Sequence, residues 1–209
     1  MRNWILMGDI VGSSNADQLI LQREFASLIR RVNEDYPSSF ESPLTITLGD
    51  EFQGVVRSSK EAAEVVIALE EYRWDLEIEI VIRYSLGLGE ITTPINPNIA
   101  YGMLGPGLSE VREALVEMKQ EEDRMMISGK FETKTQLALS MNIFLEKQEE
   151  WKWRDREIIS GYFKYRDYKK VAEVMGKDVS LIWRRFKSLE FDSYRKRKKL
   201  VRLIYANNV

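Results

Sequence analysis

The first half of the chain switches between the periodicity of strands and that of helices. The apolar run from Trp4 to Ile10 predicts a short buried strand. Apolar residues then recur at helical spacing, which predicts an amphipathic helix over residues 15–34, capped at its N-terminus by Ser14. Residues 44–48 alternate between apolar and polar side chains, as a strand does when one of its faces is buried.

A second short strand, residues 52–56, comes after two acidic residues, so the two strands are expected to form a hairpin. Helical spacing returns over residues 62–72, and residues 76–90 alternate again as a long strand. The resulting order, β-α-β-β-α-β, is the ferredoxin-like plan, in which helices cover one face of an antiparallel sheet. The predicted fold class is therefore α+β.

The second half of the chain is mainly helical. Residues 90–107 are rich in proline and glycine and predict a long loop, and loops of this length are often functional. A helix over residues 108–120 and a short strand over residues 124–128 come next, and the pattern is helical from residue 134 onward. We therefore expect a ferredoxin-like domain over residues 1–133 and a small helical domain over residues 134–209.

Three carboxylates stand out against this plan. Asp50 and Glu51 lie at the hairpin turn, and Asp9 lies near the end of the first strand, which neighbours the third strand in a ferredoxin-like sheet. Carboxylates so close together repel each other unless a cation is present, so we interpret Asp9 and Asp50 as ligands of a divalent metal. Glu51 is a third possible ligand or an exposed neighbour. Taken singly, each aspartate is also explained as a turn residue that binds backbone amides.

The composition limits what that metal site could be. The chain has no histidine and no cysteine, which excludes zinc sites of the usual type, Ser-His and Cys-His nucleophile pairs, and acid–base catalysis by imidazole. Oxygen ligands favour magnesium, manganese or calcium, and we expect Mg²⁺ or Mn²⁺. No apolar run is long enough for a membrane span or a signal peptide, so a cytoplasmic protein without a membrane partner is expected.

Charge is distributed unevenly along the chain. Residues 151–209 hold 17 Lys and Arg against 7 Asp and Glu, whereas residues 1–150 hold 14 against 26. A basic C-terminal part of this kind predicts contact with a polyanion such as DNA. The alternative is that the basic and acidic parts neutralise each other across an interface.

Residues 168–187 fit the spacing of a helix-turn-helix. Ala172 occupies the close helix-crossing position, Gly176 the turn, and Ile182 the buried position of the second helix, which Asp178 would cap. The second helix would then face the major groove, and the basic run after it would contact phosphates. The predicted DNA contacts are Ser180, Trp183, Arg184, Lys187, Arg195, Lys196, Arg197, Lys198 and Lys199. A helix pair used for protein contacts is the alternative.

Two motifs carry a resemblance to known families. "GDIVGS" at residues 8–13 and "LGDEFQ" at residues 48–53 resemble the metal-binding motifs of class III nucleotidyl cyclases and of diguanylate cyclases with their GGDEF signature. The resemblance implies a palm-type ferredoxin-like fold, two magnesium ions on the aspartates, and backbone amides after the first strand that hold a nucleoside triphosphate. The implied nucleotide site comprises Val11, Gly12, Ser13 and Ser14, and Arg83 and Arg112 are the best cationic candidates for the phosphates.

The two motifs, "RYSLGLGEI" at residues 83–91 and "GPGLSEVREAL" at residues 105–115, followed by a helix-turn-helix-like tail, together resemble the SatD family over nearly the whole chain. The resemblance to catalytic cyclases is less complete. Where those enzymes carry an Asn and an Arg four residues apart, this chain has Ser109 and Glu113, and Leu48 replaces the first glycine of the GGDEF signature. These departures favour binding over cyclase turnover.

Three functions remain open from the sequence. The first is a transcriptional regulator or sensor in which a nucleotide- or metal-binding domain controls a DNA-binding tail. The second is a magnesium-dependent nucleotidyl cyclase or another nucleotide-processing enzyme. The third is an oligomeric adaptor, and for any of them a homodimer is expected.

Overall fold

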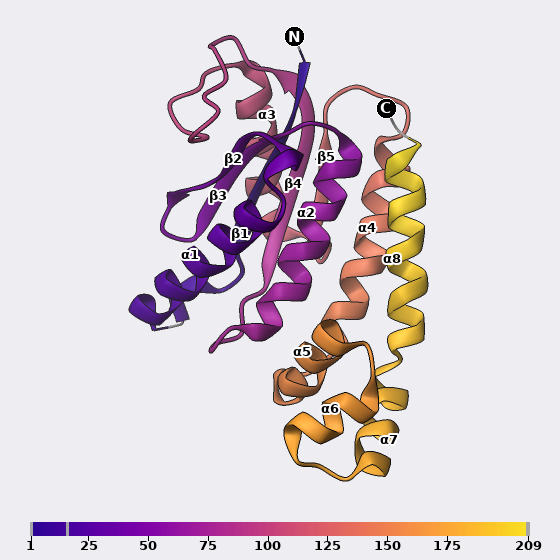
Figure 1. Cartoon of the computed structure of the whole chain (residues 1–209). Coiled ribbons are helices and arrows are strands. Elements are labelled where there is room, and N and C mark those ends of the chain that lie inside the picture. The colour runs from indigo at the N-terminus through magenta and orange to yellow at the C-terminus, as the bar shows by residue number, and fades with distance from the viewer. Residues whose placement is uncertain (1, 16, 208–209) are drawn as a thin grey trace.

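A five-stranded sheet forms the centre of the computed structural model, which describes residues 2–15 and 17–207 (Figure 1). The strands lie in the order β2-β3-β1-β4-β5, and β1 is antiparallel to both β3 and β4. The first four strands therefore have the predicted ferredoxin-like order, and β5 adds a parallel edge strand beside β4. The strands are β1 (Arg2–Ile10), β2 (Phe40–Leu48), β3 (Glu51–Val56), β4 (Ile82–Glu90) and β5 (Met125–Ser128).

Two helices cover one face of this sheet, as the sequence predicted. Helices α1 (Gln18–Asp35) and α2 (Ser59–Tyr72) share one apolar core with Leu6 and Ile10 of β1. Alternate residues of a strand point to opposite faces, so Ile5 and Met7 point away from this core. They belong to a second apolar cluster on the other face of the sheet.

That second face is covered by α3 (Pro106–Glu117), so helices lie on both faces of the sheet and not on one only. Glycines of β4 allow the helix to come close. A Cβ atom added to Gly89 would lie 2.4 Å from the Cα atom of Gly107 in α3. The glycines on this face of β4 therefore make room for a neighbouring backbone.

Two predicted boundaries differ in the structure. Helix α1 is capped by Asp17, whose carboxylate accepts hydrogen bonds from the amides of Leu19 and Ile20, while Ser14 lies in a preceding 3₁₀ turn. Strand β4 begins at Ile82 and is shorter than the predicted strand over residues 76–90. A 3₁₀ turn (Arg73–Asp75) extends α2 just before this segment and buries Trp74.

The remaining helices are α4 (Lys134–Glu149), α5 (Arg156–Tyr165), α6 (Tyr168–Met175), α7 (Val179–Leu189) and α8 (Phe191–Ala206). Helices α4 and α8 run side by side, and α8 also packs against α2 (Figure 1). None of the described helices is both long and apolar enough to cross a membrane.

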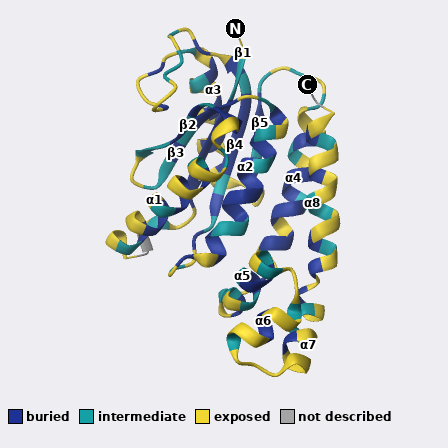
Figure 2. Cartoon of the chain, in the orientation of Figure 1, coloured by how far each residue is buried: buried dark blue, intermediate teal, exposed yellow. Residues whose placement is uncertain are grey.

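The division into two domains at residue 134 stays a prediction, and α8 packs across this boundary. Buried Tyr194, Val201 and Tyr205 of α8 belong to the same apolar core as the sheet, and buried positions continue from the sheet through α2 to α4 and α8 (Figure 2). The Tyr205 hydroxyl donates to the Leu137 carbonyl at 3.1 Å, and its own carbonyl accepts from Ser59 of α2 at 3.1 Å. The physical reason is that α8 is apolar along one side, which α2 and α4 cover.

The predicted helix pair is present within this larger arrangement. Gly176 has a positive φ of 61° in the turn between α6 and α7, and Asp178 caps α7 by accepting from two amides. Ala172 and Ile182 are buried against each other in a small apolar cluster. The spacing in the sequence therefore located both helices and the turn between them.

A buried charged network lies between α2 and the sheet. The Glu70 carboxylate accepts hydrogen bonds from Arg124 Nη1 at 2.8 Å and from the Tyr84 hydroxyl at 2.9 Å, and Arg73 Nε lies 3.0 Å away. Burial alone would raise the pKa of Glu70, but the two arginines lower it to about 2. The carboxylate is therefore ionised and links α2 to β4 and to the start of β5.

Candidate functional site

The end of β1 brings the predicted site residues together. Asp9 lies opposite Glu51 of β3 on one side and opposite Arg83 of β4 on the other. Paired residues on neighbouring strands share a face of the sheet, so these three side chains point to the face covered by α3. The convergence of Asp9 with the hairpin, predicted from the topology, is thus present in the backbone.

Asp9 is neutralised by cations of the protein itself. Its side chain is buried, accepts a hydrogen bond from Arg83 Nε at 3.1 Å and lies 3.3 Å from Lys119 Nζ. Burial raises the pKa of Asp9, and the two cations only partly oppose this effect. Glu51 in turn forms an ion pair with Arg112 of α3.

Asp50 is held in a different way. Its carboxylate accepts a hydrogen bond from the Ser13 hydroxyl at 2.5 Å, and its carbonyl accepts from the Ile10 amide at 3.0 Å. The hairpin turn is therefore fixed to the loop after β1. Gly49, with a positive φ of 31°, gives the turn its shape beside Asp50.

The loop and the hairpin turn together form the walls of a surface hollow of about 450 Å³. The "GDIVGS" and "LGDEFQ" motifs both contribute to it, although they are far apart in the sequence. We call it the sheet-edge hollow, and it is lined by Ser13, Ser14, Gln18, Leu21, Gln22, Gly49 and Asp50. Its polar groups are hydroxyls, amides and one carboxylate, which can bind the hydroxyls and ring nitrogens of a small polar ligand.

Cations of the protein occupy the place where a metal ion was predicted beside Asp9. Across residues 2–15 and 17–207, no three acidic side chains gather in a way that could hold one. Asp9 and Glu51 are engaged by Arg83, Lys119 and Arg112, and Asp50 by Ser13. Binding of Mg²⁺ or Mn²⁺ by Asp9, Asp50 and Glu51 therefore stays a prediction.

The predicted phosphate loop is only partly available. The Val11 amide donates to the Val81 carbonyl at 2.8 Å, so it cannot also hold a phosphate. Gly12 and Ser14 are exposed, and Ser13 is half-buried. Lys119 was not among the predicted site residues, although it is seven residues from Arg112 and therefore lies on the same side of the predicted helix.

The predicted DNA contacts divide into two groups. Ser180, Trp183, Arg184 and Lys187 of α7 are exposed, as are Arg195, Lys196 and Lys199 of α8. Arg197 and Lys198 instead turn inward, where Arg197 donates to the Ile143 carbonyl at 2.7 Å and Lys198 forms an ion pair with Glu71 at 2.5 Å.

Some of the basic charge thus neutralises the acidic part of the chain. Arg202 pairs with Glu64 at 2.7 Å, and Lys198 and Arg166 both pair with Glu71. These contacts are the neutralisation that the sequence left open as an alternative to DNA binding. They reduce the positive charge that remains for a nucleic acid.

The sequence profile of the SatD family matches residues 4–204. No curated protein matches the chain. Among solved structures, a bacterial light-regulated adenylyl cyclase has a TM-score of 0.46 at 12% identity, covering 62% of this chain and 43% of that one. The catalytic core of a rhodopsin-guanylyl cyclase in complex with ATPαS has a TM-score of 0.44 at 16% identity, covering 55% of this chain and 71% of that one.

Proposed function

This chain belongs to the SatD family, and because two of its sequence motifs meet at one edge of the sheet, we propose that it binds and processes a nucleotide there. The hydrogen bond between Ser13 and Asp50 carries this proposal, since it joins the loop after β1 to the hairpin turn. A hollow with both motifs in its walls is suited to a ligand that neither motif could bind alone.

In this proposal, the two sides of the site bind different parts of the nucleotide. Ser14 and Asp50 offer a hydroxyl and a carboxylate to the sugar and the base. Arg83 and Lys119 do not line the hollow but hold Asp9 on the face covered by α3. A triphosphate that extends past the end of β1 would exchange their contact with Asp9 for its own phosphates. Mg²⁺ or Mn²⁺ remains an expected cofactor, and no step is derived from it.

Incubation of the full chain with each of the four nucleoside triphosphates, with and without Mg²⁺ or Mn²⁺, would test the proposal. Binding is followed with a fluorescent nucleotide analogue and products by mass spectrometry. Loss of one charged hydrogen-bond partner costs about 1.5 kcal/mol or more, so Asp50→Asn should weaken binding about tenfold. Lys119→Gln should weaken it similarly for triphosphates.

Glu34→Gln, on the exposed C-terminal half of α1, is the matched control and should bind like the wild type. Equal affinity of the wild type and Asp50→Asn would contradict a nucleotide in the sheet-edge hollow. Binding without any product would leave a nucleotide-binding protein and remove the processing step.

A DNA-binding regulator is a second candidate, favoured by the exposed outer side of α7. Ser180 and Arg184 lie on that side, and Asp178 fixes the start of the helix. Polarisation assays with duplex genomic fragments at low salt would test it. Arg184→Ala should weaken duplex binding about fivefold or more if its guanidinium contacts a phosphate or a base edge, and unchanged binding would count against this surface. A homodimer likewise stays a prediction.

A further inference from the structure

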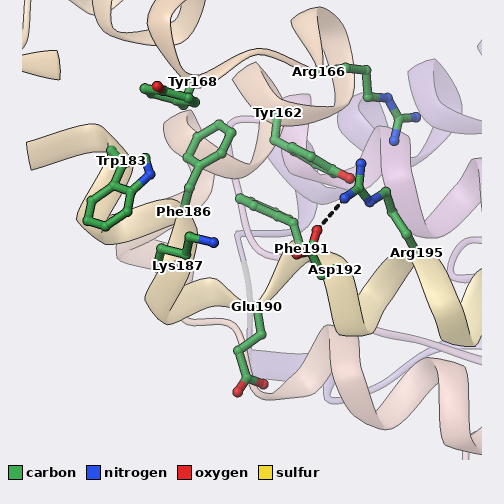
Figure 3. A pocket seen from close by; sticks show the side chains of 10 residues that line it. All are labelled: Tyr162, Arg166, Tyr168, Trp183, Phe186, Lys187, Glu190, Phe191, Asp192 and Arg195. Atoms are coloured by element: carbon green, nitrogen blue, oxygen red, sulfur yellow. Dashed lines mark hydrogen bonds and ion pairs between the residues drawn. The ribbon is translucent and has the colours of Figure 1, made fainter. Parts of the chain in front are cut away.

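A second hollow lies at the far end of the molecule, between the last four helices. It has a volume of about 230 Å³ and is formed by side chains of α5 to α8 and the turns between them (Figure 3). Its lining is Tyr162, Arg166, Tyr168, Trp183, Phe186, Lys187, Glu190, Phe191, Asp192 and Arg195. It shares no residue with the sheet-edge hollow, so a ligand can bind here whether or not the sheet edge binds a nucleotide.

Aromatic rings make up the inner wall of this hollow. Tyr162 and Phe191 are stacked with their centroids 3.7 Å apart, and Phe186 meets Phe191 edge-on at 4.9 Å. Tyr162 and Phe191 are buried, whereas Trp183 at the opening is 45% exposed. A large exposed tryptophan beside a packed aromatic wall leaves a ring face that a ligand can cover.

The rim of the hollow has an excess of available positive charge. Glu190 is engaged by Lys147 at 2.8 Å, and Asp192 forms an ion pair with Arg195. Lys187 lies 5.9 Å from the centroid of Trp183, and within the described part of the chain it pairs with no carboxylate. Arg166 adds a further exposed cation, with Glu71 at the longer distance of 3.7 Å.

One buried polar group points to the same conclusion. Tyr162 is buried, and among the described residues its hydroxyl makes no hydrogen bond of good geometry; the Arg166 guanidinium beside it, 5.2 Å from the centre of the ring, lowers the pKa that burial raises. Figure 3 shows this hydroxyl directed toward the guanidinium groups of Arg166 and Arg195, which are themselves exposed. A hydroxyl and two guanidinium groups thus converge, and an anion between them would accept hydrogen bonds from all three.

We propose that this hollow binds a nucleotide, either free or as one unit of a single-stranded nucleic acid, with the base against Trp183 and the phosphates along the cationic rim formed by Lys187, Arg166 and Arg195. The volume of the hollow indicates whether it encloses a whole ligand or only part of one. Pockets that enclose drug-sized ligands measure about 300–1,000 Å³, so this smaller hollow suits one flat ring system with the sugar and phosphate outside. Stacking of unpaired bases on aromatic side chains beside cations is a general mode of single-strand recognition.

The test uses the full chain and three probes at low salt: a labelled oligothymidylate, a labelled duplex and a fluorescent ATP analogue. We expect the single strand to bind more tightly than the duplex. Trp183→Ala should weaken binding about tenfold, and Trp183→Phe, which keeps a ring, much less. Lys187→Gln should lower the slope of log K against log salt by about 0.7, as expected when one phosphate contact on a single strand is lost.

Lys152→Gln, an exposed lysine outside the hollow, is the control and should leave both affinity and salt slope unchanged. The proposal would be overturned if Trp183→Ala bound both the single strand and the ATP analogue with the same affinity as the wild type. Binding of duplex alone would also overturn it, while supporting the outer side of α7 as a DNA surface. Binding of the ATP analogue that responds to Asp50→Asn but not to Trp183→Ala would place the nucleotide at the sheet edge only.

Discussion

Asp9 and Glu70 are both buried carboxylates beside two cations, yet their pKa values move in opposite directions. Burial raises the pKa of Asp9 more than Arg83 and Lys119 lower it. For Glu70, Arg124 and Arg73 outweigh burial and bring the pKa to about 2. The ionised form of Glu70 therefore stabilises the fold. Ionisation of Asp9 instead lowers the stability of the fold, which is typical of functional positions.

Asp9→Asn should be at least as stable as the wild type at neutral pH. Burial raises the pKa of Asp9 in the folded state above its value in the unfolded chain. The protonated Asp9 side chain therefore contributes fully to the stability of the fold below the unfolded pKa, and this contribution is lost as pH rises through the folded pKa. Asparagine cannot ionise, so the variant escapes this loss, and the two proteins should converge near about pH 3. Urea unfolding between acidic and neutral pH measures the difference. A variant that is less stable at neutral pH would show that the two cations stabilise the carboxylate more than burial penalises it.

Glu70→Gln should lower the free energy of unfolding by about 3–5 kcal/mol, because it leaves buried Arg73 without its charged partner and buried Arg124 with Glu149 alone. The folded pKa of Glu70 is lowered to about 2, so the wild type should lose this stability as pH falls from about 4.5 to about 2. The variant should be much less sensitive to pH in that window. Chemical unfolding at several pH values tests both points, with the exposed Glu34→Gln as a control.

The sequence predicts which site residues lie close together only where the order of the strands determines it. The order β-α-β-β-α-β places the first strand beside the third, so Asp9 and the hairpin acids had to be neighbours. The partners that neutralise them could not be predicted, because Lys119 reaches Asp9 only through the angle at which α3 crosses the sheet. No spacing in the sequence specifies that angle.

At the scale of elements, the sequence predicted that α3 is a helix, but it did not predict which face of the sheet α3 covers. The alternation over residues 76–90 predicted a strand, but it does not specify what approaches the glycines of that strand. In the structure they meet α3, with Gly89 and Gly107 in backbone contact. The helix pair α6–α7 could be predicted because its signals are local: a glycine in the turn and an aspartate cap.

Gly107→Ala should loosen α3 from the sheet. An added Cβ atom would lie 2.6 Å from the backbone of Gly89, a distance that only a shift of the helix can relieve. Overpacking of this kind costs about 1–3 kcal/mol. Thermal unfolding and hydrogen exchange of the β4 amides would measure it, and Ser109→Ala on the exposed side of α3 should have little effect. Unchanged stability would mean that α3 is free to move.

At the scale of the whole molecule, α8 shares the largest apolar core with the sheet, although the sequence predicted a boundary between domains at residue 134. The charge difference between the two parts was interpreted as a sign of a polyanionic partner, and part of it is used in pairs such as Arg202 with Glu64. The sequence could not show this, because the pairs join residues that are brought together only by the packing of α8 on α2.

Residues 134–209 made alone should not fold cooperatively. Val201 and Tyr205 would lose the cover that α2 provides, and the Ser59 hydroxyl would no longer hold the end of α8. We expect helical circular dichroism with a broad thermal transition, whereas the full chain should melt sharply. A sharp transition in the fragment would contradict this expectation and support the predicted division into two domains.

The helix that closes this core, α8, is also the last of the described helices to leave the ribosome. The sheet, α2 and α4 are synthesised earlier, so the apolar side chains that α8 will cover face water while translation continues. Such exposure favours aggregation of the nascent chain. Chaperone binding during synthesis is therefore expected on the outer side of α2, and the chaperone should leave once Tyr205 has emerged and packed.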